Sequence, residues 1–308
     1  MKRYRDFNTY LREIFGERVQ KISLDAGLSC PNRDGTLSHE GCLFCDARGS
    51  GSGARIHQGL SISQQIDQSR VFLSRRYKAK KFIAYFQSFT NTYGSIPHLK
   101  ALYDEALAQK DMVGLSVGTR PDCVDEEVMA LLAGYASTHL VWVEYGLQSA
   151  HDRTLKRINR GHDVACFERS VYLAREHSLN ICAHVILGLP GEDRDMILQT
   201  ARFLSTLPIQ GVKIHLLYVV AGTPLAALYQ KGGYRCLEQV EYTDLVVDFL
   251  ERLPPDLIIQ RLTGDPQPSE IVAPDWATDK SRNLLIIQQR LEEETPGRVD
   301  CTTVKNGA

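Results

Sequence analysis

Strand-like and helix-like runs alternate along residues 19–220, and few folds are compatible with that order. The strand-like runs cover Val19 to Leu24, Phe82 to Phe86, Met112 to Val117, Leu140 to Tyr145, Ile181 to Leu187 and Val212 to Leu217. Helical patterns lie between them, at Ser61 to Tyr77, Ile96 to Gln109, Asp125 to Ala136, Asp163 to Glu176 and Arg194 to Leu207. Six β/α units in series predict a parallel α/β sheet, because each crossover returns to the same sheet with one hand. Since a closed barrel needs eight units, we expect a partial (β/α)6 barrel with its chemistry at the carboxyl ends of the strands.

The segments on either side of this region have other patterns. Residues 1–18 predict an N-terminal amphipathic helix, in which apolar side chains recur at helical spacing from Phe7 to Phe15. Residues 221–308 predict a C-terminal α+β extension, with a helix, a strand, a proline-containing loop and a last helix at Leu237 to Leu253, Leu257 to Leu262, Thr263 to Trp276 and Lys280 to Glu294. We therefore expect three parts: residues 1–18, a core of residues 19–220, and residues 221–308.

Composition narrows the class of protein. A hydrophobic share of 43% in 308 residues is enough for a large core. The net charge of -1 predicts no overall attraction to nucleic acid, so a polyanion would need a local basic patch. No apolar run is long enough to cross a membrane, and eight cysteines without a secretion signal favour a reducing cytoplasm over a disulfide framework.

Three cysteines, Cys30, Cys42 and Cys45, stand at C-x11-C-x2-C spacing where the first strand ends in a loop. Three thiolates can hold three irons of a 4Fe–4S cluster and leave the fourth iron open to a small chelating molecule. The alternative is a zinc site in which His39 or His57 supplies the fourth ligand. The remaining cysteines are scattered and are expected to be small buried hydrophobes: Cys123, Cys166, Cys182, Cys236 and Cys301.

With the cysteines placed on a six-unit β/α chain, roughly residues 20–220 resemble the radical S-adenosylmethionine (SAM) superfamily. The segment YGLQSAHDRTLKRINRGHD from Tyr145 and the segment HVILGLPGED from His184 are similar to the fourth- and fifth-strand regions of its coproporphyrinogen-oxidase, methylthiotransferase and elongator branches. The segments LDAGLSCPNRDG, FQSFTNTYG, VGTRPD and HLLYVVAGTPLA look like a small bacterial family allied to the elongator catalytic subunit. The resemblance does not extend to elongator's acetyltransferase domain or to the additional domain and cysteines of the methylthiotransferases. Carboxymethylation and methylthiolation are therefore not expected.

The resemblance implies a mechanism and two cofactors. SAM would chelate the open iron of the 4Fe–4S cluster, and one electron from the reduced cluster would cleave SAM to methionine and a 5′-deoxyadenosyl radical. That radical would remove hydrogen from an unactivated carbon. The electron would come from a flavodoxin- or ferredoxin-type donor, and the protein would position the reacting atoms and exclude water.

Site residues carry over motif by motif. Gln148 and Arg160 match positions that contact SAM in the coproporphyrinogen-oxidase branch, although Arg160 could instead be an exposed cation at a helix end. Ile186, Gly188 and Pro190 match the stretch that lies along the adenine.

Other positions depart from the family pattern. The glycine-rich motif after the second strand is absent, and Gln87, Ser88 and Thr90 could accept the same bonds from the methionyl amino group. His184 stands where the coproporphyrinogen oxidases have an aspartate, and Glu144 near the end of the fourth strand is either polar support or a surface residue. No catalytic side chain is assigned.

Three hypotheses for the function remain. The first is an enzyme that modifies tRNA, acting on a wobble uridine, and it depends on the elongator-like kinship and on a basic run with no acid in it: Arg70, Arg75, Arg76, Lys78, Lys80 and Lys81. The run could equally be a solvated helix end. The second is a radical SAM enzyme for a small molecule or cofactor precursor. The third is a non-catalytic zinc or iron–sulfur RNA-binding module.

Overall fold

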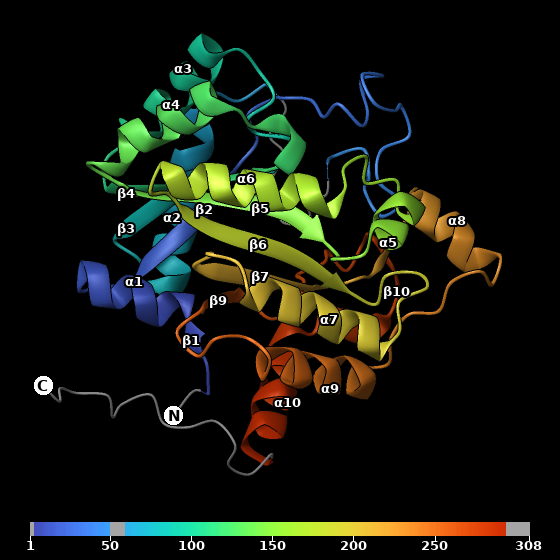
Figure 1. The fold of residues 1–308 in the computed structure, drawn as a ribbon. Coiled ribbons are helices and arrows are strands. Elements are labelled where there is room, and N and C mark those ends of the chain that lie inside the picture. Colours follow the sequence, from blue (N-terminus) through green and yellow to red (C-terminus); the bar gives the residue numbers. More distant parts are fainter. Residues whose placement is uncertain (1–2, 50–58, 294–308) are drawn as a thin grey trace, which may run out of the picture.

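The computed structural model describes residues 3–49 and 59–293, and its centre is one curled sheet of eight parallel strands (Figure 1). The strand order is β1-β9-β7-β6-β5-β4-β3-β2. The strands are β1 (Arg5–Asp6), β2 (Val19–Leu24), β3 (Lys81–Phe86), β4 (Met112–Thr119), β5 (Leu140–Gln148), β6 (Asn180–Leu187), β7 (Gly211–Leu216) and β9 (Ile258–Arg261). A separate antiparallel pair joins β8 (Val219–Val220) to β10 (Ile271–Ala273). The predicted partial barrel is confirmed.

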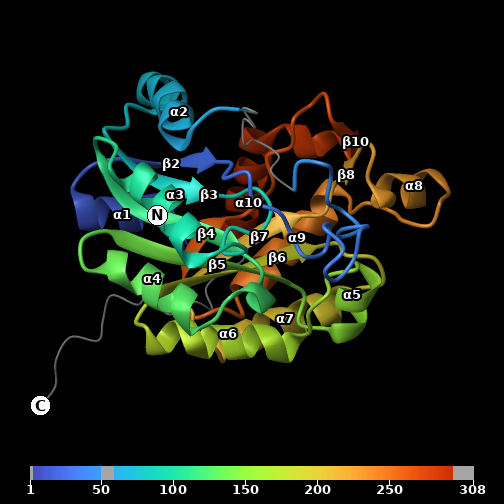
Figure 2. The same cartoon turned by 90° about the horizontal axis from the view of Figure 1, so that it is seen from above.

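Helices cover the outer face of the curled sheet, as the view from above shows (Figure 2). The helices of the described chain are α1 (Phe7–Phe15), α2 (Ile62–Tyr77), α3 (Ile96–Leu107), α4 (Glu126–Ala136), α5 (Asp152–Arg157), α6 (Val164–Glu176), α7 (Arg194–Ser205), α8 (Pro224–Gln230), α9 (Gln239–Leu250) and α10 (Lys280–Glu293), with 3-10 turns at Pro121–Cys123 and Asp275–Thr278. Of these, α1 lies at the amino ends of the strands, and α8 projects beyond their carboxyl ends (Figure 1). Side chains alternate across each strand. On β5, Val141, Val143 and Tyr145 therefore pack outward into the main core, while Trp142 and Glu144 point into the barrel.

The six predicted strands all form, each within two residues of the predicted ends except β5, which runs three residues further to Gln148. The sheet is larger than predicted because two more strands join it. The strand expected in the C-terminal extension becomes β9, which pairs with β7, and residues 5–6 form β1 on its far side. The sheet thus includes strands from all three expected parts, so their boundaries at residues 18 and 220 remain a proposal.

The amino ends of the strands are closed by α1. Asp6 caps this helix by accepting hydrogen bonds from the backbone N–H groups of Asn8 (3.1 Å) and Thr9 (3.2 Å). Phe7 and Tyr10 then meet the edge of the Trp142 ring at centroid distances of 5.7 and 5.9 Å. This aromatic layer plugs one end of the barrel, so the interior opens at the other end and along its side.

The side opening is the gap between the edge strand β2 and strand β9, which we call the seam. Lys21 on β2 crosses it by donating a hydrogen bond from Nζ to Oε1 of Gln260 on β9 at 2.7 Å. A pocket lies in the seam and is lined by residues of α1, β2, α2, β9 and α10. Within the described part of the chain, no helix is both long and apolar enough to cross a membrane.

Candidate functional site

A cavity opens at the carboxyl ends of strands β2 to β7, and all three predicted metal ligands line it: Cys30, Cys42 and Cys45. The loop that carries them is fixed to the turn after α5. Asn32 donates from Nδ2 to the Asn159 carbonyl at 2.5 Å, Asn159 donates from Nδ2 to the Gly41 carbonyl at 2.7 Å, and the Leu43 N–H bonds the Ile158 carbonyl at 2.9 Å. The two segments therefore position one another.

Most of the predicted SAM-binding residues line the same cavity: Gln87, Thr90, Glu144, Gln148, Arg160, His184 and Ile186. Three of them lie elsewhere. Ser88 is buried away from the cavity wall, the Gly188 carbonyl accepts a hydrogen bond from Tyr234 (2.9 Å), and Pro190 lines a separate hollow beside Arg157. The structure thus brings together predicted residues from β3, β5 and β6 or the segments that follow them, and their roles toward SAM stay predictions.

Arg160 is buried, with 7% of its surface exposed, so the alternative of an exposed helix-end cation is wrong. Its Nε and Nη2 donate to the Gly146 carbonyl at 3.2 and 2.8 Å, and its Nη1 lies 3.5 Å from the Cys42 sulfur. A Cβ on residue 146 would lie 2.5 Å from Arg160 Nη2, which explains why a glycine stands there. The guanidinium thus contacts both the end of β5 and the sulfur that we predict as an iron ligand.

Arg120, in the segment VGTRPD, is a site residue that the sequence pattern did not single out. It follows β4, is 2% exposed and lines the cavity. Its Nε and Nη2 form a fork with Asp122 at 2.9 and 2.7 Å, while its Nη1 has no hydrogen-bond partner among the described residues. Arg120 is therefore a buried arginine with one unused donor near the cysteines. In the sequence, only the segment VGTRPD could have pointed to this role.

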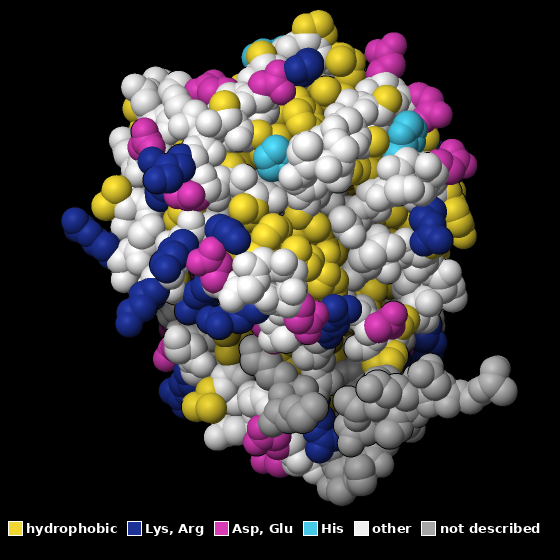
Figure 3. All heavy atoms as spheres, turned by 90° about the vertical axis from the view of Figure 1, so that its left-hand side faces the viewer, with side chains coloured by type: hydrophobic (Ala, Val, Ile, Leu, Met, Phe, Trp, Pro, Cys, Tyr) yellow, Lys and Arg dark blue, Asp and Glu magenta, His cyan; other side chains and the backbone are white. Residues whose placement is uncertain are grey.

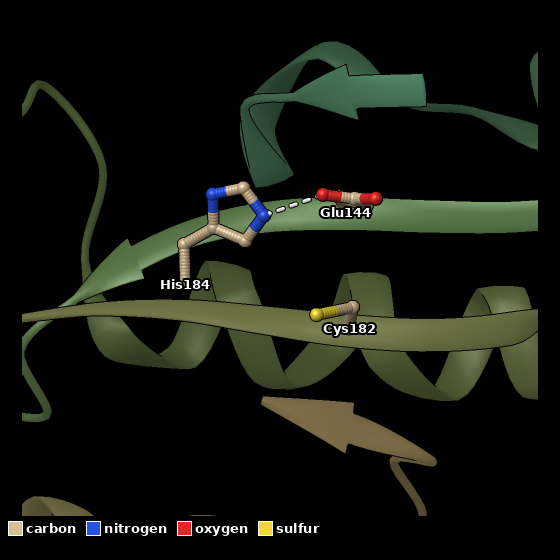
Figure 4. Close-up of side chains that lie close together, drawn as sticks. All are labelled: Glu144, Cys182 and His184. Carbon is tan, nitrogen blue, oxygen red and sulfur yellow. Dashed lines mark hydrogen bonds and ion pairs between the residues drawn. The ribbon is translucent and has the colours of Figure 1, made fainter. Parts of the chain in front are cut away.

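Below the cavity lies a buried ionic centre around Glu144, which is completely buried and is not a surface residue. Its Oε1 accepts hydrogen bonds from Lys21 and Ser116, and its Oε2 accepts from Lys213 and from His184 Nε2 (2.8 Å). Figure 4 shows the His184 ring pointing at this carboxylate from the neighbouring strand. Burial raises the pKa of Glu144, but the two lysines and His184 outweigh it and hold this pKa well below its usual range.

Burial also shifts the pKa values of the groups around Glu144. Burial and the charge of Lys213 lower the pKa of His184 to about 4, so its ring is neutral at pH 7. Burial also lowers the pKa of Lys213 to about 7, against the opposing effect of Glu144. It raises the pKa of the Cys182 thiol, which therefore stays protonated. The centre is thus one carboxylate shared by two amino groups.

Glu144, Cys182 and His184 bring three ligand atoms within 4.8 Å of one another, and no other such group occurs in the described part of the chain. A metal ion there is disfavoured, because two lysines occupy the carboxylate and the thiol is protonated.

At least two of the three cysteine sulfurs lie more than 4.8 Å apart, since the three form no such group. Tetrahedral zinc would hold thiolates about 3.8 Å apart, as its bond length of roughly 2.3 Å requires. The spread therefore fits an iron–sulfur cluster better than zinc. His39 is exposed, and His57 lies outside the described residues. The cavity also presents Thr90 Oγ1 and Arg120 Nη1 without partners in the described structure, as expected where a polar cofactor binds.

Comparison with known families matches two models to the chain. The radical SAM superfamily matches residues 35–204, and the radical SAM C-terminal domain matches residues 209–293. The family uses a 4Fe–4S cluster and SAM, and the three cysteines and the cavity provide a donor set suited to both.

Several relatives match most of the chain. YtqA of Bacillus subtilis (strain 168) is 44% identical over 291 residues, covering 94% of this chain and 90% of YtqA. YhcC of Escherichia coli (strain K12) is 38% identical over 288 residues, covering 93% and 92%. The tRNA uridine(34) acetyltransferase of Dehalococcoides mccartyi is 30% identical over 175 residues, covering 56% of this chain and 37% of the relative.

Among solved structures, the archaeal Methanocaldococcus infernus Elp3 with an N-terminal deletion shares the fold, with a TM-score of 0.65 at 17% identity. The match covers 89% of this chain and 62% of that one. The family models, the full-length relatives and the partial barrel agree. The chain therefore belongs to the radical SAM superfamily, in the family that contains YtqA and YhcC, and it is an enzyme.

Proposed function

We propose that this enzyme modifies tRNA, with a uridine as the target base. The observation that carries the proposal is the partial similarity to a tRNA uridine(34) acetyltransferase and to Elp3, which extends over half of the chain or more. The similarity covers only 37% of the acetyltransferase, so the proposal concerns the shared barrel. The cytoplasm, where tRNA is found, is the proposed location. A flavodoxin- or ferredoxin-type protein is the proposed electron donor.

In this proposal Cys30, Cys42 and Cys45 hold the cluster, and Gln148 and Thr90 bind SAM at the cavity wall. Bound there, the cluster and SAM supply reductive cleavage of SAM and hydrogen abstraction. Arg160 keeps the Cys42 thiolate and the Gly146 backbone in place. Arg120 supplies an unused N–H donor beside the cysteines.

The seam supports the proposal because basic residues adjoin it, of which Arg76 is exposed and Arg18 half-buried. Tyr77 at the end of α2 lines the seam pocket, and the guanidinium groups of Arg18 and Arg76 lie 5.1 and 5.5 Å from the centre of its ring. Aromatic rings and arginine side chains are the groups with which proteins stack the bases of single-stranded RNA. An RNA strand held on this surface would lie beside an opening into the barrel.

The test is mass spectrometry of tRNA nucleosides from a deletion strain. One modified uridine should disappear or be replaced by a precursor, and the wild-type gene should restore it. Cys42→Ala should not restore it, because the cluster would lack a ligand. Cys166→Ser, a matched change on α6 outside the cavity, should restore it fully. If every tRNA nucleoside is unchanged in the deletion strain, a small-molecule substrate replaces tRNA.

A further inference from the structure

Several hydrogen-bond donors of the barrel interior have no acceptor. Lys213 on β7 is 4% exposed, and Glu144 is the one acceptor that its ammonium group contacts among the described residues. Gln260 Nε2 and His215 Nε2 are buried without a partner in the same part of the structure. Arg261 makes no hydrogen bond or ion pair with any described residue. Buried donors without acceptors are costly, and an ammonium group can donate three bonds.

This region also has more positive than negative charge. Lys21 and Lys213 both pair with the single carboxylate of Glu144, and the guanidinium of Arg261 adds a further positive charge beside Lys213. The acids at the rim of the seam are already used, since Asp265 pairs with Lys280 at 2.7 Å and Asp6 caps α1. A surplus of positive charge in a buried site is stabilised by an anion that brings its own acceptors.

These groups lie close together. Lys213 and Arg261 are register partners on adjacent strands, and the charge of Arg261 contributes to lowering the pKa of both Lys213 and His215. Lys213 also lies 4.1 Å from the centre of the Tyr85 ring. Tyr85 and Arg261 line both the cofactor cavity and the seam pocket, so a ligand between them faces both openings.

The group lies deeper in the barrel than Gln148, which we propose binds SAM. Glu144 precedes Gln148 by four residues on β5, which corresponds to about 13 Å at the rise of an extended strand. The carboxylate of SAM, held at the cysteine loop, would not be the anion that meets Lys213. The anion that meets Lys213 would instead belong to a second molecule that enters through the seam.

We propose that Lys213, Arg261, Gln260 and Lys21, which we call the cationic centre, bind an oxyanion of the substrate, either a carboxylate or a phosphate. The inference rests on the proposed radical SAM site, because it assigns the anion to the molecule that loses hydrogen there. The cationic centre anchors one end of the substrate at the seam. The remainder extends toward the carboxyl ends of the strands, where the cysteine loop lies.

The experiment is anaerobic isothermal titration calorimetry of the reconstituted protein with SAM present. Inorganic phosphate and acetate are titrated separately at constant ionic strength, with chloride as the reference. We expect one equivalent of phosphate or acetate to bind, and the tighter of the two identifies the oxyanion. Lys213→Met and Arg261→Met should each weaken that binding at least tenfold. Arg202→Met, which removes an exposed cation from α7, should leave it unchanged.

Arg261 is only partly buried, so Arg261→Met keeps the test valid if Lys213→Met does not fold. The inference would be overturned if Arg261→Met bound phosphate and acetate as tightly as the wild-type protein does. The outcome is independent of the tRNA proposal, because oxyanion binding is measured without RNA. Unchanged tRNA nucleosides in a deletion strain together with tight oxyanion binding would leave the cationic centre assigned to a small-molecule substrate.

Discussion

Arg160 and Gln148 come from one sequence motif, yet the structure gives them different surroundings. Arg160 uses its donors on Gly146 and Cys42. Gln148 ends β5 with φ +76°, a left-handed conformation that costs roughly 1 kcal/mol or more in a residue other than glycine. Its side chain lines the cavity and forms no hydrogen bond with a described residue. The strained backbone aims an unused amide at the proposed cofactor.

Gln148→Ala should therefore weaken SAM binding. Loss of one uncharged hydrogen bond, worth about 0.5–1.5 kcal/mol, corresponds to a decrease in affinity of roughly two- to twelvefold. The measurement is equilibrium binding of SAM to the reconstituted protein, with iron content checked in the same sample. Gln199→Ala, an exposed glutamine on α7, is the control and should bind SAM as the wild type does. Unaltered SAM affinity in Gln148→Ala would remove Gln148 from the site.

For individual residues, the sequence predicted which residue types form the site better than it predicted the contacts that they make. Cys30, Cys42 and Cys45 are predictable because their spacing is itself the signal. Arg120 was missed because its fork with Asp122 and its burial depend on how the turn after β4 packs. Glu144 was predicted near the barrel mouth, and its four donors come from four other strands that no local pattern relates.

At the scale of elements, α1 determines whether the amino end of the barrel is closed. Leu11 is 2% exposed in this helix and packs with Val19 and Ile83 of the two neighbouring strands. Leu11→Ala should lower the free energy of unfolding by about 2–5 kcal/mol, since it removes buried methyl groups and leaves a cavity. The measurement is urea denaturation followed by circular dichroism.

Ile14→Ala is the control for that prediction, because Ile14 lies on the same helix and is 48% exposed. It should change stability by less than about 1 kcal/mol. Comparable destabilisation of the two variants would show that α1 does not pack as described.

The elements themselves were largely predictable, and the exceptions are short. Strand β1 has two residues and β10 has three, so neither contains enough alternation for a periodic signal. Each is held by hydrogen bonds from a strand that is distant in the sequence, β9 for β1 and β8 for β10. The predicted loop from Thr263 to Trp276 contains β10 for this reason.

On the surface of the whole molecule, only part of the basic run from Arg70 to Lys81 is available to contact RNA phosphates. Arg70 pairs with Asp67 at 2.7 Å and Lys81 pairs with Glu17 at 3.2 Å, so the run is not free of acids in space. The other members are exposed at the end of α2 and just after it: Arg75, Arg76, Lys78 and Lys80. They lie at the amino ends of the strands, the face on which lysine and arginine side chains gather at one side in Figure 3.

If this surface binds tRNA phosphates, reversing Arg75, Arg76 and Lys80 to Glu should weaken tRNA binding. The slope of log affinity against log salt should become shallower by roughly 0.9 for each phosphate that the protein no longer neutralises. The measurement is a filter-binding or fluorescence titration of tRNA at several salt concentrations.

The matched control reverses three exposed arginines on α6 and α7, Arg169, Arg175 and Arg202, and changes the net charge equally. It should have a smaller effect and keep the wild-type slope. An equal decrease in affinity in both triple variants would mean that tRNA responds to total charge and not to this surface.

The pairing of β1 with β9 has a consequence for biosynthesis. Residues 5–6 leave the ribosome first, yet their partners at residues 258–259 are made about 250 residues later. At roughly 5–20 residues per second, that interval is on the order of 13–50 s. Until it ends, the growing sheet has an open edge at β7, and exposed edges invite pairing with other chains. The nascent protein therefore completes its barrel only after β9 emerges, which makes the interval before that the one in which a chaperone would matter most.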